Sequence, residues 1–332
     1  MATSIMAKEA AEAPSIIATQ LVKNLPLCRD LGEKIRAFNP AFVYMVGRGS
    51  SDHAGVFAKY LIEVEANIPV CAAAPSVNSV YKQTLNLKSA LVICISQSGR
   101  SPDILAQTKA AKDSGAFTVA LVNDQASPLA EMADFVLPIG ANEEKAVAAT
   151  KSYLATLSAL LQMVACWQQD DELLTALNDL PSAMEKAATA PMQLNADFVA
   201  PLNHCVVLGR GFGYAISREI ALKLKEVCSV HAEAFSSAEF LHGPVTLVEK
   251  KLAIVDISVK DESLTSHQEQ IDEVTRRGAR VCKLDQSNIA IHPRLSPLLI
   301  LQRFYLDIEQ IAVGMGLDPD SPAGLKKVTQ TI

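Results

Sequence analysis

The sequence has no cluster of lysine and arginine. Its 332 residues carry 30 basic and 36 acidic side chains, with a net charge of −6 at pH 7 and an isoelectric point near 5.6. Nucleic acids and anionic membrane surfaces attract basic patches, so we expect neither as a partner.

Long hydrophobic runs are also missing. The most apolar window, residues 153–167, is interrupted by Thr156, Ser158 and Gln162 and is too short to span a bilayer. Residues 1–13 contain two glutamates and no apolar core, unlike a signal peptide. We therefore expect a cytoplasmic protein.

The seven cysteines form no CxxC pair, and their number is odd. Cys94, Cys205 and Cys282 fall within apolar stretches, so we expect buried thiols in a reducing compartment rather than disulfides, zinc ligands or nucleophiles. The chain has neither a metal motif nor a nucleotide-binding fingerprint, so we expect no cofactor and no metal.

Apolar stretches typical of buried strands alternate with helical stretches. Strands are predicted at residues 42–46, 68–72, 90–95, 117–122, 134–138, 204–208, 252–257 and 279–284. Helices are predicted at 15–38 with an interruption at Pro26, and at 52–66, 145–167, 214–227 and 298–315. This alternation predicts an α/β protein with parallel sheets between helices. The predicted organisation is N-terminal helices (1–40), a first domain (41–168), a helical connection (169–200) and a second domain (201–332).

A serine-rich loop, Ser96-Gln97-Ser98-Gly99-Arg100-Ser101, follows the third predicted strand, and Pro102 then begins a helix. Backbone N–H groups, a helix N-terminus and serine hydroxyls would all point at one place, which suits a phosphate ester. An ordinary serine-capped turn is the alternative.

The strand-turn pattern recurs in the second half of the chain. Gly47-Arg48-Gly49 returns as Gly209-Arg210-Gly211, and Ile95-Ser96 returns as Ile257-Ser258, both 162 residues later. The second loop contains Asp261 and Glu262, which would repel phosphate. We therefore expect one anion site, in the first copy.

Ionisable side chains are dense between residues 219 and 244. Glu219, Lys223 and Glu226 share one helix face by their spacing, and histidines follow at positions 231 and 242. A solvated, salt-bridged face is the alternative, and either histidine could be structural. Together with a phosphate site, a carboxylate and a histidine indicate proton chemistry such as aldose–ketose interconversion.

These motifs resemble the SIS (sugar isomerase) family, and within it the isomerase half of glutamine:fructose-6-phosphate aminotransferases. The similarity spans nearly the whole chain, and the matching stretches are Gly49–Ser51, Ser96–Gly99, Val147–Lys151, Ala221–Glu226, His231–Ala234, Glu239–Pro244 and Asp320–Thr329.

The resemblance implies two tandem SIS domains, each a five-stranded parallel sheet between helices, and a homodimer whose active site takes a loop from the partner. It implies phosphate contacts from Ser96, Gln97, Ser98 and Ser101, and sugar contacts from Ser50, Ser51, Val147 and Ala149. Glu226 would move the proton between carbons 1 and 2, and His242 of the second copy would assist ring opening. Lys327 would lie near carbon 2, with Glu219 and Lys223 supporting the base.

Two residues depart from the aminotransferase pattern, Arg100 in place of an acid and Ala149 in place of a serine. Residues 1–2 lead straight into the isomerase region, so amide transfer from glutamine is not expected of this chain alone. The expected activity is that of a glucosamine-6-phosphate deaminase of the SIS type, with a phosphosugar substrate.

The alternatives are a fructosamine-6-phosphate deglycase, a galactosamine-6-phosphate deaminase and a non-catalytic phosphosugar sensor. A sensor needs the phosphate loop but has no need of Glu226, His242 and Lys327. The first 40 residues also lack a basic DNA-binding module.

Overall fold

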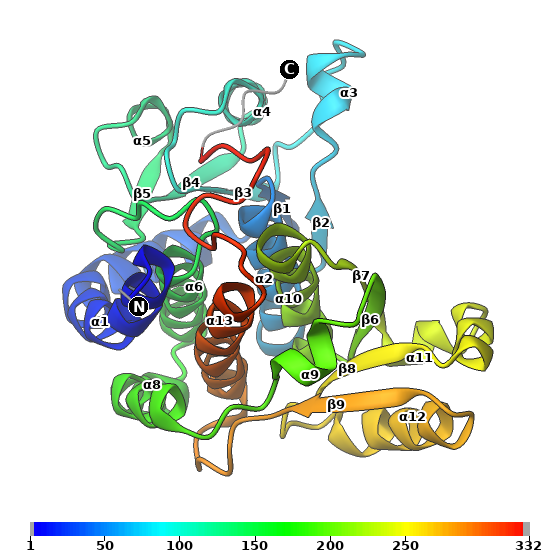
Figure 1. The fold of residues 1–332 in the computed structure, drawn as a ribbon. Coiled ribbons are helices and arrows are strands. Elements are labelled where there is room, and N and C mark those ends of the chain that lie inside the picture. The colour runs from blue at the N-terminus through cyan, green and yellow to red at the C-terminus, as the bar shows by residue number, and fades with distance from the viewer. Residues whose placement is uncertain (1–2, 328–332) are drawn as a thin grey trace. The chain divides into compact units, whose positions relative to one another are not determined.

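The computed structural model describes residues 3–327, which form two compact units (Figure 1). The first unit contains residues 15–144 and 151–178, and the second contains residues 3–14, 145–150 and 179–327. Helix α1 (Ile5–Phe38) therefore gives its first turns to the second unit. The predicted domains are continuous segments, whereas each of these two units is made of several segments.

The first unit is built on a parallel sheet of five strands, as predicted. The strand order is β2-β1-β3-β4-β5, and the strands are β1 (Phe42–Val46), β2 (Val70–Ala72), β3 (Ala90–Ser96), β4 (Phe117–Val122) and β5 (Phe135–Pro138). All seven residues of β3 are buried, which agrees with the continuous apolar run of a central parallel strand.

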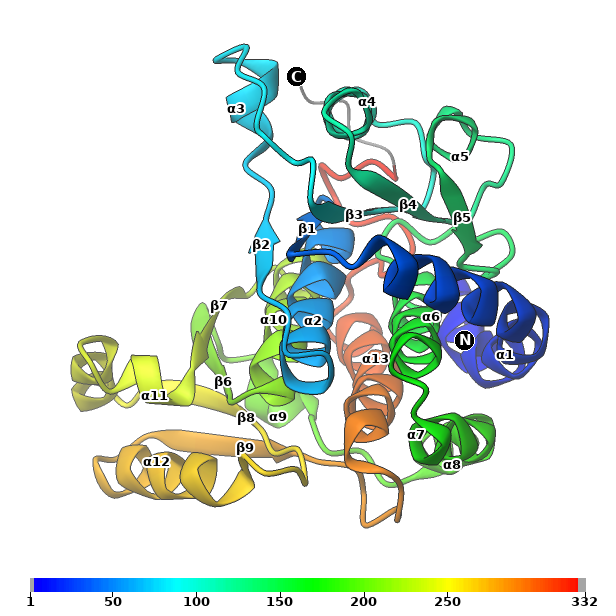
Figure 2. The ribbon, with the colours of Figure 1, turned by 180° about the vertical axis from the view of Figure 1, so that it is seen from behind.

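Helices α2 (Ser50–Glu65), α4 (Pro102–Asp113) and α5 (Pro128–Met132) pack against the strands of this sheet. The unit also contains α3 (Pro75–Ser79), which packs on α4, α6 (Lys151–Gln168), which packs on α2, and α7 (Asp171–Ala176), which packs on α6. Ile104 of α4 and Leu129 of α5 pack on Val92 and Ala120 of the sheet. Helices α2 and α6 lie side by side (Figure 2). The carboxyl edge of the sheet is left for the loops.

The second unit contains a parallel sheet of four strands among the described residues. Its order is β7-β6-β8-β9, with β6 (His204–Gly209), β7 (His231–Ser236), β8 (Ala253–Ile257) and β9 (Arg280–Leu284). The prediction of a fifth strand was wrong. After β9, Ser287 and Asn288 form a turn with positive φ, and Pro293 starts the 3-10 helix η3 (Pro293–Leu295), so only a short stretch remains between them.

The helices of the second unit are α8 (Leu180–Thr189), α9 (Ala196–Val199), α10 (Phe212–Cys228), α11 (Ser237–Phe240), α12 (Leu264–Arg276) and α13 (Ser296–Gly314). Two 3-10 helices, η1 (Leu177–Asp179) and η2 (Pro244–Lys250), also lie in this part of the chain. Helix α10 packs along α13, β6 and β7. Phe240, Val248 and Ile271 pack on Leu208 and Ile254 of the sheet.

Two helix predictions need correction. Helix α1 continues through Pro26 instead of breaking there. Pro26 has no N–H to donate to the Val22 carbonyl, but both residues face solvent, so water can bond this carbonyl. Helix α6 begins at Lys151 instead of residue 145, and residues 145–150 form an irregular loop whose backbone bonds are made elsewhere.

Two of the three thiols expected to be buried, those of Cys94 and Cys205, are buried, whereas the prediction for Cys282 was wrong. Cys94 and Cys205 are buried, and burial raises the pKa of each to about 12, which makes them poor nucleophiles and ligands. Cys282 is half-buried. In the part of the chain described, the helices are each too short or too polar to cross a bilayer.

Candidate active site

The loop between β3 and α4 contains the four residues that were predicted to contact phosphate, Ser96, Gln97, Ser98 and Ser101. Ser101 caps α4 with extended backbone and makes no side-chain capping bond, and Pro102 is the first helical residue. Ser96 Oγ accepts a bond from Gly99 N at 3.0 Å, and Ser98 Oγ accepts one from Arg100 N at 3.4 Å. Because both hydroxyls accept from the backbone, their own protons are available to an incoming anion.

Gly99 is required for this loop. Its φ is +63°, and an added Cβ would lie 2.2 Å from Ser127 Oγ and 2.9 Å from Val122 Cγ2. The backbone turns tightly against α5, with Leu129 N donating to the Gly99 carbonyl at 3.2 Å. A side chain at this position would push the loop off the sheet.

An ion pair between a half-exposed arginine and a buried aspartate joins the turn after β1 to the start of α4 at the same edge of the sheet. Arg48, in the turn after β1, donates from Nε to Asp103 Oδ2 at 2.6 Å, and the Asp103 side chain is 1% exposed. Asp103 lies in the first turn of α4, where a free carboxylate would repel a bound anion. Arg48 neutralises it and fixes the spacing of the two loops.

Arg100 points its charge at a neighbouring loop. Its Nη2 lies 2.8 Å from Asp124 Oδ2, and both side chains are largely exposed. Arg100 holds the pKa of Asp124 below its ordinary value through hydrogen bonding. The positive charge of Arg100 is therefore balanced by an acid on the next loop.

Ser50 and Ser51 occupy the first turn of α2, beside the serine loop in the sheet order. Gly49 precedes them with a φ of +53°, and a Cβ on Gly47 would lie 2.8 Å from the Ser51 backbone. Both serines are half-buried. In the second unit, Gly211 takes nearly the same conformation, with φ 54° and ψ −124° against φ 53° and ψ −128° at Gly49.

The second unit holds the charged side chains of α10. The Lys223 ammonium is 1% exposed and lies 2.6 Å from Glu226 Oε2 and 3.2 Å from Glu219 Oε1. The Tyr305 hydroxyl donates to Glu219 Oε1 at 3.3 Å. Burial opposes the charge on Lys223, but the two carboxylates outweigh it and raise the pKa of the ammonium above its ordinary value.

Glu226 differs from Glu219 in its exposure. The side chain of Glu226 is 22% exposed, whereas that of Glu219 is fully buried. Glu226 lines a cavity of about 510 Å³ between the end of α10 and residues 316–325, which also contribute Asp318 and Leu325. Glu226 is thus an anchored carboxylate that faces a space of ligand size.

The loop of residues 145–150 is fastened by both ends of the described chain. The Glu9 carboxylate accepts bonds from the backbone N–H of Lys145 at 2.5 Å and of Ala146 at 3.2 Å. Val147 N donates to the Asp320 carbonyl at 3.0 Å, and Lys327 Nζ donates to the Ala146 carbonyl at 2.7 Å. The Asp320 carboxylate also accepts from the first two N–H groups of α1, at 2.9 and 2.7 Å.

His242 lies in the turn after α11, and its side chain is exposed. Its backbone N–H donates to the Glu239 carbonyl at 3.0 Å. His231 is also exposed, on the edge strand β7, where its N–H bonds the Asn203 carbonyl at 3.0 Å. Neither histidine is needed to satisfy a buried group.

The second-copy loop holds its own acids. Asp261 Oδ1 accepts from Ser263 N at 2.8 Å, and Arg294 clamps Glu262 with two bonds of 2.7 and 2.8 Å. The bonds from Arg294 lower the pKa of Glu262 to about 2. Arg294 thus holds Glu262 as a carboxylate, and two acidic side chains occupy a loop whose counterpart in the first unit carries serines.

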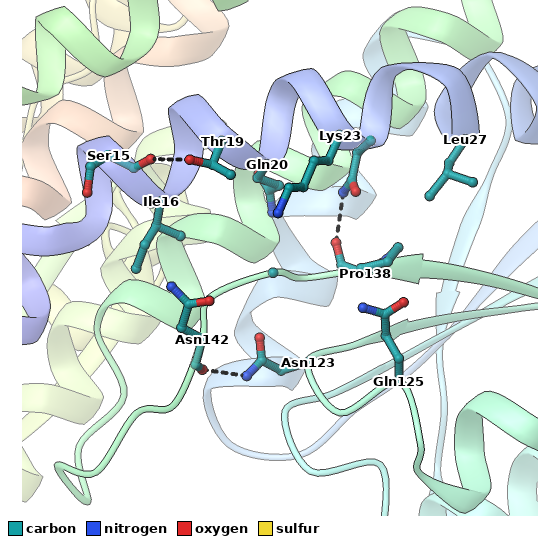
Figure 3. A pocket seen from close by; sticks show the side chains of 12 residues that line it. Ser15, Ile16, Thr19, Gln20, Lys23, Leu27, Asn123, Gln125, Pro138 and Asn142 are labelled. Carbon is teal, nitrogen blue, oxygen red and sulfur yellow. Dashed lines mark hydrogen bonds between the residues drawn. The ribbon is translucent and has the colours of Figure 1, made fainter.

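A further cavity of about 510 Å³ lies in the first unit, between α1 and the loops after β4 and β5 (Figure 3). Lys23, Asn123, Gln125 and Asn142 line it together with Ser15, Ile16, Thr19, Gln20, Asn24, Leu27, Pro138 and Gly140. Asn24 donates to the Pro138 carbonyl at 2.7 Å, which fixes one wall. The polar lining suits a polar guest, and the sequence interpretation did not include this cavity.

The predicted site residues fall into separate groups. Ser50, Ser51, Ser96, Gln97, Ser98, Arg100 and Ser101 belong to the first unit, whereas Val147, Ala149, Glu219, Lys223, Glu226, His242 and Lys327 belong to the second. Within the second unit, the α10 triad meets, and Lys327 lies beside the loop of Val147 and Ala149.

Sequence reasoning missed Arg48, Asp103, Tyr305 and Glu9. The first two flank predicted loops and could have been suspected from their opposite charges, but nothing in the sequence links Tyr305 or Glu9 to its partner. In the described residues, no group of three or more histidine, cysteine or acidic side chains is arranged to hold a metal ion.

Comparison with known proteins adds three findings. The sequence model of the SIS domain family matches residues 40–166 and 199–298. A glutamine–fructose-6-phosphate aminotransferase (isomerizing) of Clostridium tetani is 31% identical over 97% of this chain. The corresponding Aquifex aeolicus protein is 32% identical over 97% of this chain. This chain spans only 58% and 57% of the two relatives.

Solved structures of similar proteins also match nearly the whole chain. A chain from Silicibacter pomeroyi with a provisional phosphosugar isomerase assignment has a TM-score of 0.89 and 36% identity, and the match covers 96% of this chain and all of that one. The C-terminal domain of a Francisella tularensis glucosamine-fructose-6-phosphate aminotransferase has a TM-score of 0.82 and 26% identity, covering 97% and 99%. A Thermotoga maritima glucosamine-6-phosphate deaminase, 22% identical with a TM-score of 0.79 over 99% and 100%, shares the fold.

Proposed function

The chain belongs to the SIS domain family, and from that membership we propose that it is an enzyme acting on a phosphosugar, namely a glucosamine-6-phosphate deaminase. The reaction converts glucosamine 6-phosphate and water to fructose 6-phosphate and ammonia. The observation that carries the proposal is the Glu226 carboxylate, anchored by a buried ammonium and open to a cavity.

The phosphate group is assigned to the first unit. The free hydroxyl protons of Ser96 and Ser98, the uncapped start of α4 and the amide of Gln97 supply the donors. Ser101, Ser50 and Ser51 complete this set. Such donors recognise a phosphate ester without a metal ion.

The proton transfer is assigned to Glu226. In the open-chain substrate, Glu226 takes the proton from carbon 2, and the electron pair of the broken C–H bond forms the double bond of an enolamine between carbons 1 and 2. The aldehyde oxygen at carbon 1 receives the displaced carbonyl pair and takes a proton from solvent. Glu226 returns the proton to carbon 1, which leaves an iminium at carbon 2. Water adds there and ammonia leaves, giving the ketose.

The remaining roles follow the family resemblance. We assign ring opening to His242, donated by a second copy of the chain in a homodimer, and contacts near carbon 2 to Lys327. Val147 and Ala149 line the sugar, and Glu219 and Lys223 hold the base. All of these groups lie within residues 145–327, and the deamination needs no reactant besides water.

Ammonia release from the purified chain tests the proposal. We expect release with glucosamine 6-phosphate and an equal amount of fructose 6-phosphate. Galactosamine 6-phosphate and a fructosamine 6-phosphate are assayed beside it. Release from one of those two alone would replace the substrate assignment. Binding of fructose 6-phosphate without turnover of any of the three would favour the sensor.

Glu226→Gln tests the base. We expect turnover to fall about 10²- to 10⁴-fold, which is the usual contribution of a general base, while the fold is retained. Glu131→Gln, an exposed glutamate of α5, is the matched control and should keep full activity. Near-normal turnover by Glu226→Gln would remove the role given to this carboxylate.

A further inference from the structure

A buried polar network lies in the second unit, away from the residues that line the cavity beside Glu226. His267 of α12 is 1% exposed. Its Nε2 lies 2.6 Å from Asp256 Oδ1 on β8, and its Nδ1 lies 2.9 Å from the Ser237 hydroxyl at the start of α11. One imidazole therefore ties three elements together.

The hydrogen bonds fix where the protons lie. Arg210 can only donate, and its Nη1 lies 3.5 Å from the Gln270 side chain, so the oxygen Oε1 of that amide faces it. The same oxygen accepts the proton of Ser237. Because the Ser237 proton is used there, His267 Nδ1 must donate to Ser237, and a second proton lies between Nε2 and Asp256.

The polar groups of this network bond to one another, and they do not form a hydrolytic triad. Ser258 donates to the second oxygen of Asp256 at 3.0 Å, so both carboxylate oxygens are bonded. Ser237 is 1% exposed and gives its proton to Gln270 instead of His267, so it cannot act as a nucleophile activated by the imidazole. The network acts by holding parts of the chain in place.

The part that it holds carries His242. Ser237 is the first residue of α11, whose last residue, Phe240, is fully buried against the sheet. The next turn presents His242 to solvent, with its N–H bonded to Glu239. We infer that His267 and Asp256 are positioning residues, which act through Ser237 to fix the turn that presents His242. This inference rests on the proposed function, in which His242 assists ring opening.

A double-mutant cycle between Ser237→Ala and His242→Asn tests the inference with glucosamine 6-phosphate. If Ser237 acts through His242, Ser237→Ala alone should lower kcat about tenfold and leave KM within about twofold. In the His242→Asn background, the same change should lower kcat by less than about twofold. Ser237→Thr keeps the hydroxyl and should restore most of the loss.

The controls separate this inference from the proposed function. Ser266→Ala, a half-buried serine on the same helix as His267, should have little effect in either background. If the unmodified chain turns over glucosamine 6-phosphate but Ser237→Ala lowers kcat by the same factor with and without His242→Asn, the positioning role is overturned and the deaminase stands. If the unmodified chain turns over no substrate, the proposed function fails and this role fails with it.

Nitrogen NMR of the labelled chain reads the network without activity. Nδ1 of His267 should carry a proton bonded to Ser237, and Ser237→Ala should remove this protected Nδ1–H signal. His267→Gln identifies the resonances. An Nδ1 without a proton in the folded chain would contradict the arrangement.

Discussion

One ammonium stands between two carboxylates on α10. Lys223 is buried, Glu219 is buried beside it, and Glu226 opens to the cavity. One ammonium and two carboxylates leave a net negative charge on this face of α10. The hydrogen bond that Tyr305 donates to Glu219 stabilises part of that charge. The arrangement keeps Glu226 in place at the cavity wall.

Lys223→Met should be strongly destabilising. Removing the cation leaves two carboxylates close together without compensation, and breaking a buried pair in this way costs about 3–5 kcal/mol of the free energy of unfolding. Urea denaturation measures the loss. Lys186→Met, an exposed lysine on α8, is the control and should stay within about 0.5 kcal/mol of the unmodified chain. Equal stability of the two variants would show that the triad is not a coupled unit.

The contribution of the Glu262–Arg294 ion pair to stability should depend on pH in the acid range. The pKa of Glu262 is lowered to about 2, so its ionised form stabilises the fold above its ordinary pKa of 4.5. That stabilisation should disappear as pH falls from about 4.5 to about 2. The Tm difference between the unmodified chain and Glu262→Gln should therefore shrink over this window. Glu269→Gln, an exposed glutamate of α12, is the control; a difference independent of pH would contradict the pairing.

For individual side chains, the sequence predicts contacts within one helix but few contacts between different elements. Glu219, Lys223 and Glu226 meet because their spacing follows the helix repeat. Arg48 meets Asp103 across 55 positions, and His267 bonds residues from two other elements. Such contacts depend on how the elements pack, which periodicity does not encode.

At the level of helices and strands, the turn from β3 into α4 depends on Gly99, which has no side chain. Gly99 has positive φ and touches Ser127 and Val122, so the loop forms only if position 99 is glycine. The serines on either side, Ser96 and Ser98, then accept hydrogen bonds from the backbone N–H groups of Gly99 and Arg100.

Gly99→Ala should weaken phosphosugar binding. A Cβ would meet Ser127 Oγ at 2.2 Å in a backbone conformation that costs about 1 kcal/mol or more for alanine. We expect KM to rise about tenfold or more and the protein to stay folded. Gly115→Ala is the matched control, because Gly115 also has positive φ, +84°, but its Cβ would meet only Lys88 Cγ at 3.7 Å. Equal effects on KM would mean that strain alone, and not the loop contact, explains the loss.

Strands with long apolar runs could be predicted, and the exceptions have physical causes. Strand β7 escaped prediction because His231-Ala232-Glu233-Ala234 is not an apolar run, and its pairing with β6 makes it a strand. The predicted helix start at residue 145 was wrong because residues 145–150 bond to Glu9, Asp320 and Lys327. Tertiary partners override local preference in both cases.

In the molecule as a whole, segments distant in sequence close the second unit. Glu9 and Asp320 bind the loop of residues 145–150 from two directions, and Asp320 also caps α1. Ser4 Oγ donates to Glu309 at 2.6 Å, which adds a further tie between the beginning and end of the described chain.

Glu9→Ala should loosen this loop. Two backbone N–H groups would lose a charged acceptor, with an expected loss of about 1–3 kcal/mol and a severalfold rise in KM for the phosphosugar. Tryptic cleavage after Lys145 should become faster. Glu12→Ala, an exposed residue three positions further along α1, is the control. Unchanged cleavage and KM in Glu9→Ala would mean that Asp320 and Lys327 hold the loop without it.

The tie between Ile5 and Asp320 has a consequence for synthesis on the ribosome. The described part of the first unit is complete in sequence once residue 178 has left the exit tunnel. The second unit needs residues 3–14, but their partner Asp320 is translated 315 residues after Ile5. Residues 3–14 therefore wait for Asp320, and the nascent protein must keep them from wrong partners while the 315 residues that follow Ile5 are made.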